Sequence, residues 1–150
     1  MNDSIEKTID INAPLSRVWD AVSDYKKFGE WFQVRIDQPF ASGGRMTGKM
    51  TIPGYENLKW NGTVVAIEPP KKIAFSWITH ALDPEKDYTG EPETYCEFLL
   101  KPIEHGTRLT IVESGFSKLP ANIREETILR NKDGWAQQAQ NVKAYVERRN

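Results

Sequence analysis

The chain has 150 residues, and its 20 lysines and arginines nearly balance its 21 aspartates and glutamates, giving a formal net charge of −1. This length suits one domain with a real hydrophobic core, so we expect residues 1–150 to form a single domain. The near-neutral charge argues against a nucleic-acid-binding protein, which needs a basic excess to neutralise phosphates. No segment reaches the roughly 18 consecutive apolar residues of a membrane span.

The N-terminus and the cysteine content predict the cellular location. The first 12 residues are polar and lack the apolar core of a secretory signal peptide. Cys96 is the only cysteine, and a lone cysteine cannot form an internal disulfide bond, which suits a reducing compartment. We therefore expect a cytoplasmic protein.

The first third of the chain predicts a strand followed by two short helices. Residues 4–12 alternate apolar and polar side chains, as a half-buried strand does. Over residues 14–22 the apolar residues recur three or four positions apart, which is typical of an amphipathic helix. Asp24 is suited to cap a second short helix that carries Phe28 on its inner side.

Residues 33–116 show only strand and turn patterns, and we expect a sheet of some seven strands. A loop at residues 83–93 carries five acidic residues and one lysine, a local charge of about −4. The alternation of apolar side chains places predicted strands at residues 45–52, 58–68, 73–77, 94–100 and 107–113.

The last 30 residues predict one long helix. Pro120 fits a helix start, and an apolar stripe follows at helical spacing, formed by Trp135, Ala139, Val142 and Val146. A helix over residues 120–148 would be about 43 Å long at 1.5 Å per residue.

This order of elements predicts an α+β fold with a mainly antiparallel sheet and the helices on one face. A wide sheet curves by its own twist, and one helix cannot fill the resulting concavity. We therefore expect a pocket of a few hundred Å³ between the sheet and the long helix. Its expected lining residues are Met50, Trp77, Phe98 and Trp135.

Several short motifs follow one another in a characteristic order along the chain. The opening segment IDINAPLSRVWDAVSD, residues 9–24, resembles the START-like (SRPBCC) superfamily. Later motifs resemble its AHSA-like branch, the homologues of an activator of a heat-shock-protein ATPase. These are Trp31-Phe32, Gly43-Gly44-Arg45, the Gly62 to Pro70 strand end, Ile73-x-Phe75-x-Trp77, residues 106–116 and Gly134-Trp135.

The resemblance covers nearly the whole chain and implies a helix-grip fold. In this fold a curved antiparallel sheet wraps around a long C-terminal helix, two short helices follow the first strand, and an apolar cavity is enclosed. The superfamily includes lipid-transfer domains, plant allergens and polyketide cyclases, which share a fold with an internal cavity rather than a common reaction. Ala139 and Val142 stand where the branch has leucines, which would enlarge the cavity or leave room for neighbouring side chains to repack.

Other site motifs are incomplete. Residues 43–50 nearly match the sequence of a phosphate-binding P-loop. However, Met50 replaces the Ser or Thr that would hold magnesium, and a strand is expected where a helix should follow. One cysteine and two histidines without paired spacing do not make a zinc site. We therefore expect no cofactor and no metal.

Glu113 is the most informative polar residue, because alternation places it on the inner face with Leu109 and Ile111. It could bond a ligand hydroxyl or amine, act as a general base, or pair with a basic residue at the rim. Cys96 shares an inner face and is expected to be a small buried hydrophobe, with a reactive thiol as the alternative. His80 is expected at the rim or surface, facing away from the cavity.

The candidate ligand-binding residues combine the inward aromatic side chains with their nearest polar neighbours. They are Trp31, Met50, Trp60, Phe75, Trp77, Cys96, Phe98, Glu113, Trp135 and Gln138.

Three functions remain open. The first is a binding module that holds an apolar, aromatic or lipid-like molecule, with no catalytic residues and no stable membrane insertion. The second is an enzyme, such as a cyclase, dehydratase or hydrolase, with Glu113 as its acid–base group. The third is a co-chaperone or interaction protein that contacts a partner through the acidic loop at residues 83–93. The sequence identifies neither the ligand nor the oligomeric state.

Overall fold

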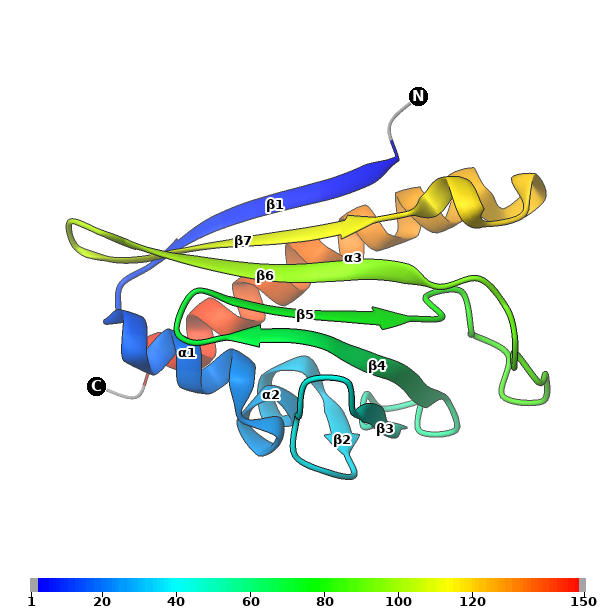
Figure 1. Ribbon diagram of the computed structural model, residues 1–150, viewed down its shortest axis with the longest axis horizontal. Helices are drawn as coiled ribbons and strands as arrows, with labels where there is room; N and C mark the ends of the chain where they lie inside the picture. Colours follow the sequence, from blue (N-terminus) through cyan, green and yellow to red (C-terminus); the bar gives the residue numbers. More distant parts are fainter. Residues whose placement is uncertain (1–2, 149–150) are drawn as a thin grey trace.

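The computed structural model describes residues 3–148, which form one seven-stranded antiparallel sheet and three α-helices (Figure 1). The strands are β1 (Ser4–Ile11), β2 (Val34–Ile36), β3 (Arg45–Met50), β4 (Lys59–Glu68), β5 (Lys72–Trp77), β6 (Thr94–Ile103) and β7 (Gly106–Ser114). The helices are α1 (Leu15–Ser23), α2 (Tyr25–Phe32) and α3 (Ala121–Glu147), with a short 3₁₀ helix at Phe116–Lys118 before α3.

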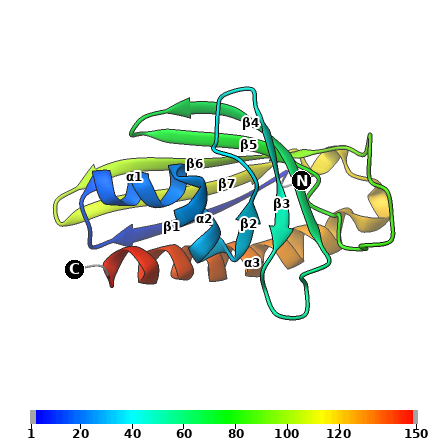
Figure 2. The ribbon, with the colours of Figure 1, turned by 90° about the horizontal axis from the view of Figure 1, so that it is seen from below.

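The sheet order is β1-β7-β6-β5-β4-β3-β2, so β1 and β2 form its two edges. The sheet curves around the long helix α3, while α1 and α2 lie near one end (Figure 2). This arrangement confirms the predicted α+β helix-grip fold, in which the two short helices follow the first strand. None of the helices within residues 3–148 is both long enough and apolar enough to cross a membrane.

Local sequence features explain where the elements begin and end. The Asp24 carboxylate accepts hydrogen bonds from the backbone N–H groups of Lys26 and Lys27 at 2.9 and 3.1 Å, which confirms its role as the N-cap of α2. Gly62 lies inside β4, and a Cβ there would approach the Ser76 carbonyl oxygen to 2.3 Å, so only glycine allows this pairing.

Two details differ from the expected elements. The edge strand β2 was not predicted, because three residues are too short for alternation to be recognised. The strand expected over residues 45–52 ends at Met50, since the turn at residues 51–58 begins before Ile52.

The predicted stripe on α3 faces the sheet, since its four residues are only 0–5% exposed. Eight aromatic rings from α2, the sheet and α3 fill the space between the sheet and the helices, with neighbouring centroids 4.5–6.2 Å apart. They belong to Phe28, Trp31, Phe32, Trp60, Phe75, Trp77, Phe98 and Trp135. The aromatic side chains therefore occupy most of the space that the curvature creates.

Candidate functional site

A fully buried carboxylate lies beneath the junction of the sheet and α3. Glu113 is 0% exposed and points inward from β7, as the alternation predicted. Its Oε2 accepts hydrogen bonds from Trp77 Nε1 at 2.9 Å and from Thr94 Oγ1 at 2.6 Å. Its Oε1 accepts hydrogen bonds from Asn131 Nδ2 at 2.9 Å and from Trp135 Nε1 at 2.8 Å.

These four donors are neutral, and within residues 3–148 Glu113 forms no ion pair. A carboxylate has about four lone-pair sites, so the four bonds use its full acceptor capacity. All four partners donate, so both Glu113 carboxylate oxygens act as acceptors in this network. The rim pairing with Arg or Lys considered from the sequence is therefore not what the structure shows, because Glu113 lies too deep for solvent or cations to reach it.

The hydrogen bonds to Glu113 join strand β5 and helix α3, which are distant in the sequence. Trp77 ends β5 and Trp135 lies on α3, and both indole N–H groups converge on the same carboxylate from β7. Asn131, one helical turn before Trp135, also donates to Thr79 Oγ1 at 2.6 Å. Glu113 therefore fixes the orientation of both indoles and ties the helix to the sheet.

Cys96 lies next to this carboxylate on β6, directly opposite Glu113 in the strand register. Burial raises the pKa of the Cys96 thiol well above its usual value, and the negative charge of Glu113 adds to the shift. A thiol with a raised pKa is a poor nucleophile. The structure thus favours the interpretation of Cys96 as a small buried hydrophobe.

A groove of about 110 Å³ opens directly above the Glu113 network. Phe32, Trp77 and Trp135 supply its aromatic walls, and the surface it exposes is mostly apolar. Asn131 and Gln138 supply amide groups at its edge, and Gly134 leaves one side of α3 without a side chain. The groove is therefore an aromatic slot with a polar edge, formed where α2, β5 and α3 meet.

Three of the ten sequence-predicted residues line this groove, and two more lie against those three. Trp77, Trp135 and Gln138 line it. Glu113 holds the two indoles from behind, and Trp60 packs on Trp77 with centroids 4.5 Å apart.

The other five predicted residues lie elsewhere. Phe75, Cys96 and Phe98 are 0–2% exposed within the core, beyond the groove. Trp31 is also buried and donates its indole N–H to the Ala21 carbonyl at 2.8 Å, so it stabilises the packing of α1 on α2. Met50 is only partly buried at the end of β3 and does not line the groove.

The expected pocket of a few hundred Å³ is therefore wrong in size and in part of its lining. Phe98 is 0% exposed and packs against the rings of Phe28, Phe75 and Trp135, with ring centroids 5.8–6.1 Å apart. It therefore fills the space that it was expected to border. The strand pattern gives the direction in which a side chain points but not the volume that facing side chains leave between them.

Sequence reasoning missed Phe32, Asn131 and Gly134 as groove residues and Thr94 as a partner of Glu113. Asn131 could have been found, because it lies four residues before Trp135 and so shares its helix face. Thr94 could not, since its contact depends on the register between β6 and β7.

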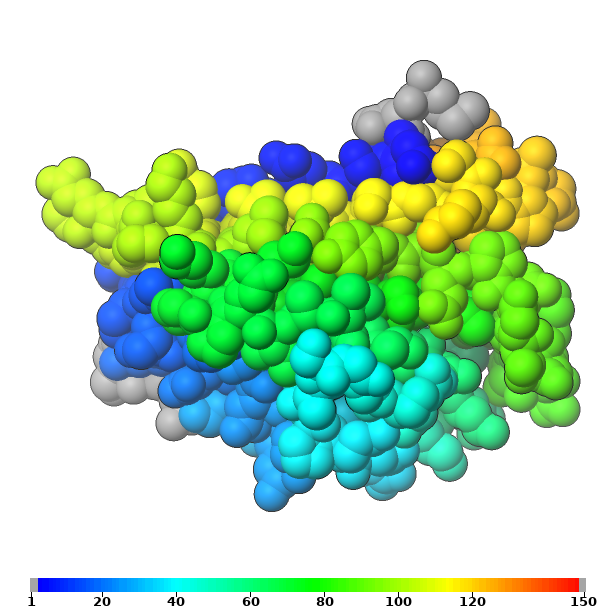
Figure 3. Space-filling model, in the orientation of Figure 1, coloured from blue at the N-terminus to red at the C-terminus, as the bar shows by residue number. Residues whose placement is uncertain are grey.

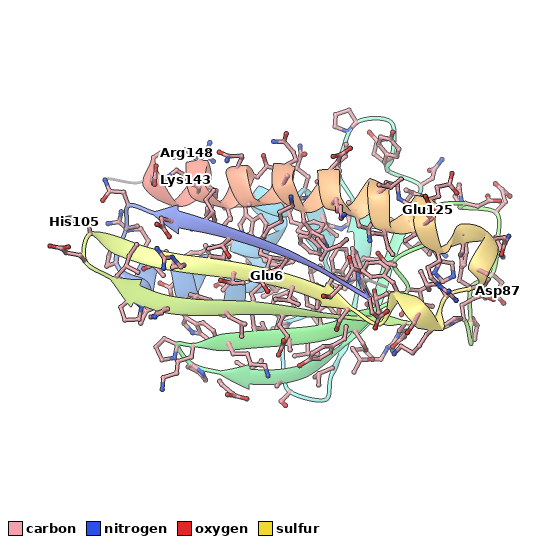
Figure 4. All side chains as sticks on the ribbon, turned by 90° about the horizontal axis from the view of Figure 1, so that it is seen from above. Glu6, Asp87, His105, Glu125, Lys143 and Arg148 are labelled. Carbon is pink, nitrogen blue, oxygen red and sulfur yellow. The ribbon has the colours of Figure 1, made fainter. Side chains whose placement is uncertain are left out.

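The two histidines lie outside the groove. The His80 side chain is only 6% exposed, and its Nε2 lies 3.1 Å from Glu91 Oε1, so the acidic loop covers this residue and it does not lie at the surface, one of its two expected positions. His105 lies in the turn between β6 and β7, at the opposite end of the molecule from Asp87 (Figure 4). Among residues 3–148, no three His, Cys, Asp or Glu side chains are grouped closely enough to hold a metal ion.

Comparisons with known proteins place this geometry among solved structures. Protein MLL2253 from Mesorhizobium loti is 22% identical with a TM-score of 0.76, covering 98% of each chain. Protein CV1439 from Chromobacterium violaceum is 24% identical with a TM-score of 0.71, covering 98% of this chain and 99% of its own. DynU16, from the dynemicin biosynthetic locus, is 21% identical with a TM-score of 0.75, and 98% of this chain matches 48% of it. None of the curated proteins matches the sequence.

A curved antiparallel sheet that grips a long C-terminal helix, with an aromatic groove at their junction, defines a START-like helix-grip domain. Residues 12–147 match the family described as Activator of Hsp90 ATPase homolog 1-like protein. The chain belongs to this family.

Proposed function

We propose that this protein is a small-molecule-binding module that holds the apolar or aromatic part of a ligand in the groove between Phe32, Trp77 and Trp135. The observation that carries this proposal is the fixed orientation of the two indoles, which Glu113 anchors from behind. A preformed aromatic slot binds with little loss of conformational freedom. We infer that the protein acts in the cytoplasm, in keeping with its single free cysteine.

The volume limits which part of a ligand can enter. A space of about 110 Å³ is on the order of one aromatic ring or one short aliphatic end. A larger apolar or lipid-like molecule would insert one end and leave the remainder over the rim. The ligand class we propose is therefore an aromatic or aliphatic compound with a narrow apolar end.

The polar edge favours a ligand that also carries a hydrogen-bond donor. Asn131 uses its Nδ2 on Thr79 and Glu113, while its Oδ1 accepts no hydrogen bond from the described residues. A ligand hydroxyl or amine could donate to this oxygen.

The groove favours binding over catalysis. None of its lining side chains titrates near neutral pH, since its polar members are the amides of Asn131 and Gln138. Glu113 lies behind the indoles, and its four hydrogen bonds leave it no free lone pair for proton transfer. The acid–base role considered for Glu113 would require these bonds to break.

The substitution Gly134→Leu tests the groove directly. Gly134 lies inside α3, and a Cβ at this position meets no atom within 4 Å, so a leucine fits the helix and fills the groove. We expect the affinity for the neutral probe N-phenyl-1-naphthylamine to fall about tenfold or more, measured by tryptophan fluorescence titration. The melting temperature should rise, because leucine favours a helix over glycine by roughly 1 kcal/mol.

Gly134→Ala is the matched control, because it gives the same helix stabilisation with only one methyl group. Its melting temperature should rise by about 2–4 °C, while its probe affinity stays within about threefold of the wild type. Equal affinity in the wild type and Gly134→Leu would show that the probe binds elsewhere and would remove the groove from the proposal.

A further inference from the structure

A row of three cations crosses the outer face of the sheet at its β2 edge. Arg35 on β2 lies directly opposite Lys49 on β3, and Lys49 lies directly opposite Lys59 on β4. All three are exposed, since their neighbours Val34, Ile36 and Trp60 point the other way into the core. Strands lie about 4.8 Å apart, so the row spans roughly 10 Å.

Like charges directly opposite each other on neighbouring strands repel and destabilise the sheet. Within residues 3–148, no ion pair relieves Arg35, Lys49 or Lys59. At the other edge of the same face, opposite charges face each other on neighbouring strands: Asp10 on β1 pairs with Arg108 on β7 at 2.8 Å. The three unpaired cations at the β2 edge therefore do not stabilise the sheet, and their alignment needs another explanation.

The row lies in a groove of about 420 Å³ that also carries polar donors. Arg45 extends the positive charge along β3 and hydrogen-bonds Asn61 and Thr63 across β4. One acidic residue, Asp37, also lines the groove, but its Oδ2 accepts from the Thr47 hydroxyl at 3.1 Å rather than from a cation. Four cations against one carboxylate leave the groove with a net charge of about +3.

We propose that this groove, on the face of the sheet opposite the aromatic groove, is a binding site for a small polyphosphate group, such as a di- or triphosphate. Cations on adjacent strands, whose backbones lie about 5 Å apart, can share the oxygens of one phosphate, and a chain of phosphates reaches across the whole row. The site is unrelated to a P-loop, since residues 45–50 form strand β3 and the contacts come from side chains rather than a backbone loop.

The surroundings favour a small ligand over a nucleic acid or a membrane. Lys59 and Asn61 also border a second hollow, of about 250 Å³, whose far wall is the acidic loop with Asp83, Lys86 and Asp87. Figure 3 shows the surface hollowed between this loop and the β2–β4 edge. The negative loop would repel an extended polyanion that ran beyond the row, whereas a di- or triphosphate ends before it.

Inorganic tripolyphosphate is the probe that tests this site, by calorimetric titration of the full chain at low salt. We expect the wild type to bind it, and Lys49→Gln to weaken the affinity about tenfold, because Lys49 is the centre of the row. Without the probe, Lys49→Gln should raise the melting temperature by about 1–2 °C, an increase that high salt removes.

The control is Lys71→Gln, which removes the same charge from an exposed turn between β4 and β5 and should change affinity less than about twofold. Three results would overturn the proposal. They are no binding by the wild type, an equal loss of affinity in both variants, and binding to phosphatidylglycerol vesicles without binding to free tripolyphosphate.

Discussion

Replacing Glu113 by glutamine is expected to lower the free energy of unfolding by about 2–4 kcal/mol, or the melting temperature by roughly 5–15 °C. Glutamine turns one acceptor oxygen into an NH₂ donor at a position where every partner donates. If the NH₂ replaces Oε2, Trp77 loses its acceptor; if it replaces Oε1, Trp135 does. Either orientation leaves a buried indole N–H unsatisfied.

Glu97→Gln is the matched control for this substitution. Glu97 is on the neighbouring strand β6, is 23% exposed at its side chain, and pairs with Lys72 at 2.8 Å. A surface ion pair of this kind contributes about 0–1 kcal/mol. Thermal unfolding followed by circular dichroism compares the two variants. A loss of stability in Glu113→Gln no larger than in Glu97→Gln would contradict the anchoring role of Glu113.

Replacing Phe98 by alanine is expected to cost about 3–5 kcal/mol, since Phe98 is fully buried among four aromatic rings. The deletion should leave an apolar void beside Trp135, similar in kind to the engineered cavities that admit benzene. We therefore expect benzene to raise the melting temperature of Phe98→Ala and to leave that of the wild type unchanged.

Leu129→Ala serves as the control. Leu129 is 57% exposed, so its substitution should lower the free energy of unfolding by less than about 0.5 kcal/mol. A loss below about 1 kcal/mol in Phe98→Ala would mean that the interior is not packed as the structure shows. In that case Phe98 would be better understood as a cavity wall, as the sequence suggested.

Alternation along the strands was sufficient to predict which side chains face inward. It placed Glu113 inside, and the structure confirms this, with Glu113 fully buried. The stripe on α3 was equally clear, because helical spacing over many residues is a strong signal. The fold could therefore be predicted nearly in full.

The site could be predicted only in part, because its shape depends on distances between elements. The sequence showed that Trp77 and Trp135 point inward but not that their indoles converge on one carboxylate. It also could not show that Phe98 closes most of the cavity, since volume depends on how facing side chains interdigitate.

The same limit applies to the cationic row on the outer face. Arg35, Lys49 and Lys59 are separated in the sequence, and each alone is an ordinary exposed basic residue. Only the strand register places them directly opposite one another. The overall charge of −1 gave no indication of this local concentration.

The most direct test of ligand binding in the aromatic groove is a titration of the five tryptophan indole N–H signals by NMR with N-phenyl-1-naphthylamine. Trp77 and Trp135 line the groove, whereas Trp31 is tied to the Ala21 carbonyl at 2.8 Å within the core and Trp19 lies on α1. We expect the signals of Trp77 and Trp135 to shift in proportion to occupancy, and those of Trp19 and Trp31 to stay in place. Shifts confined to Trp19 and Trp31, or no shift at all, would contradict ligand binding at this groove.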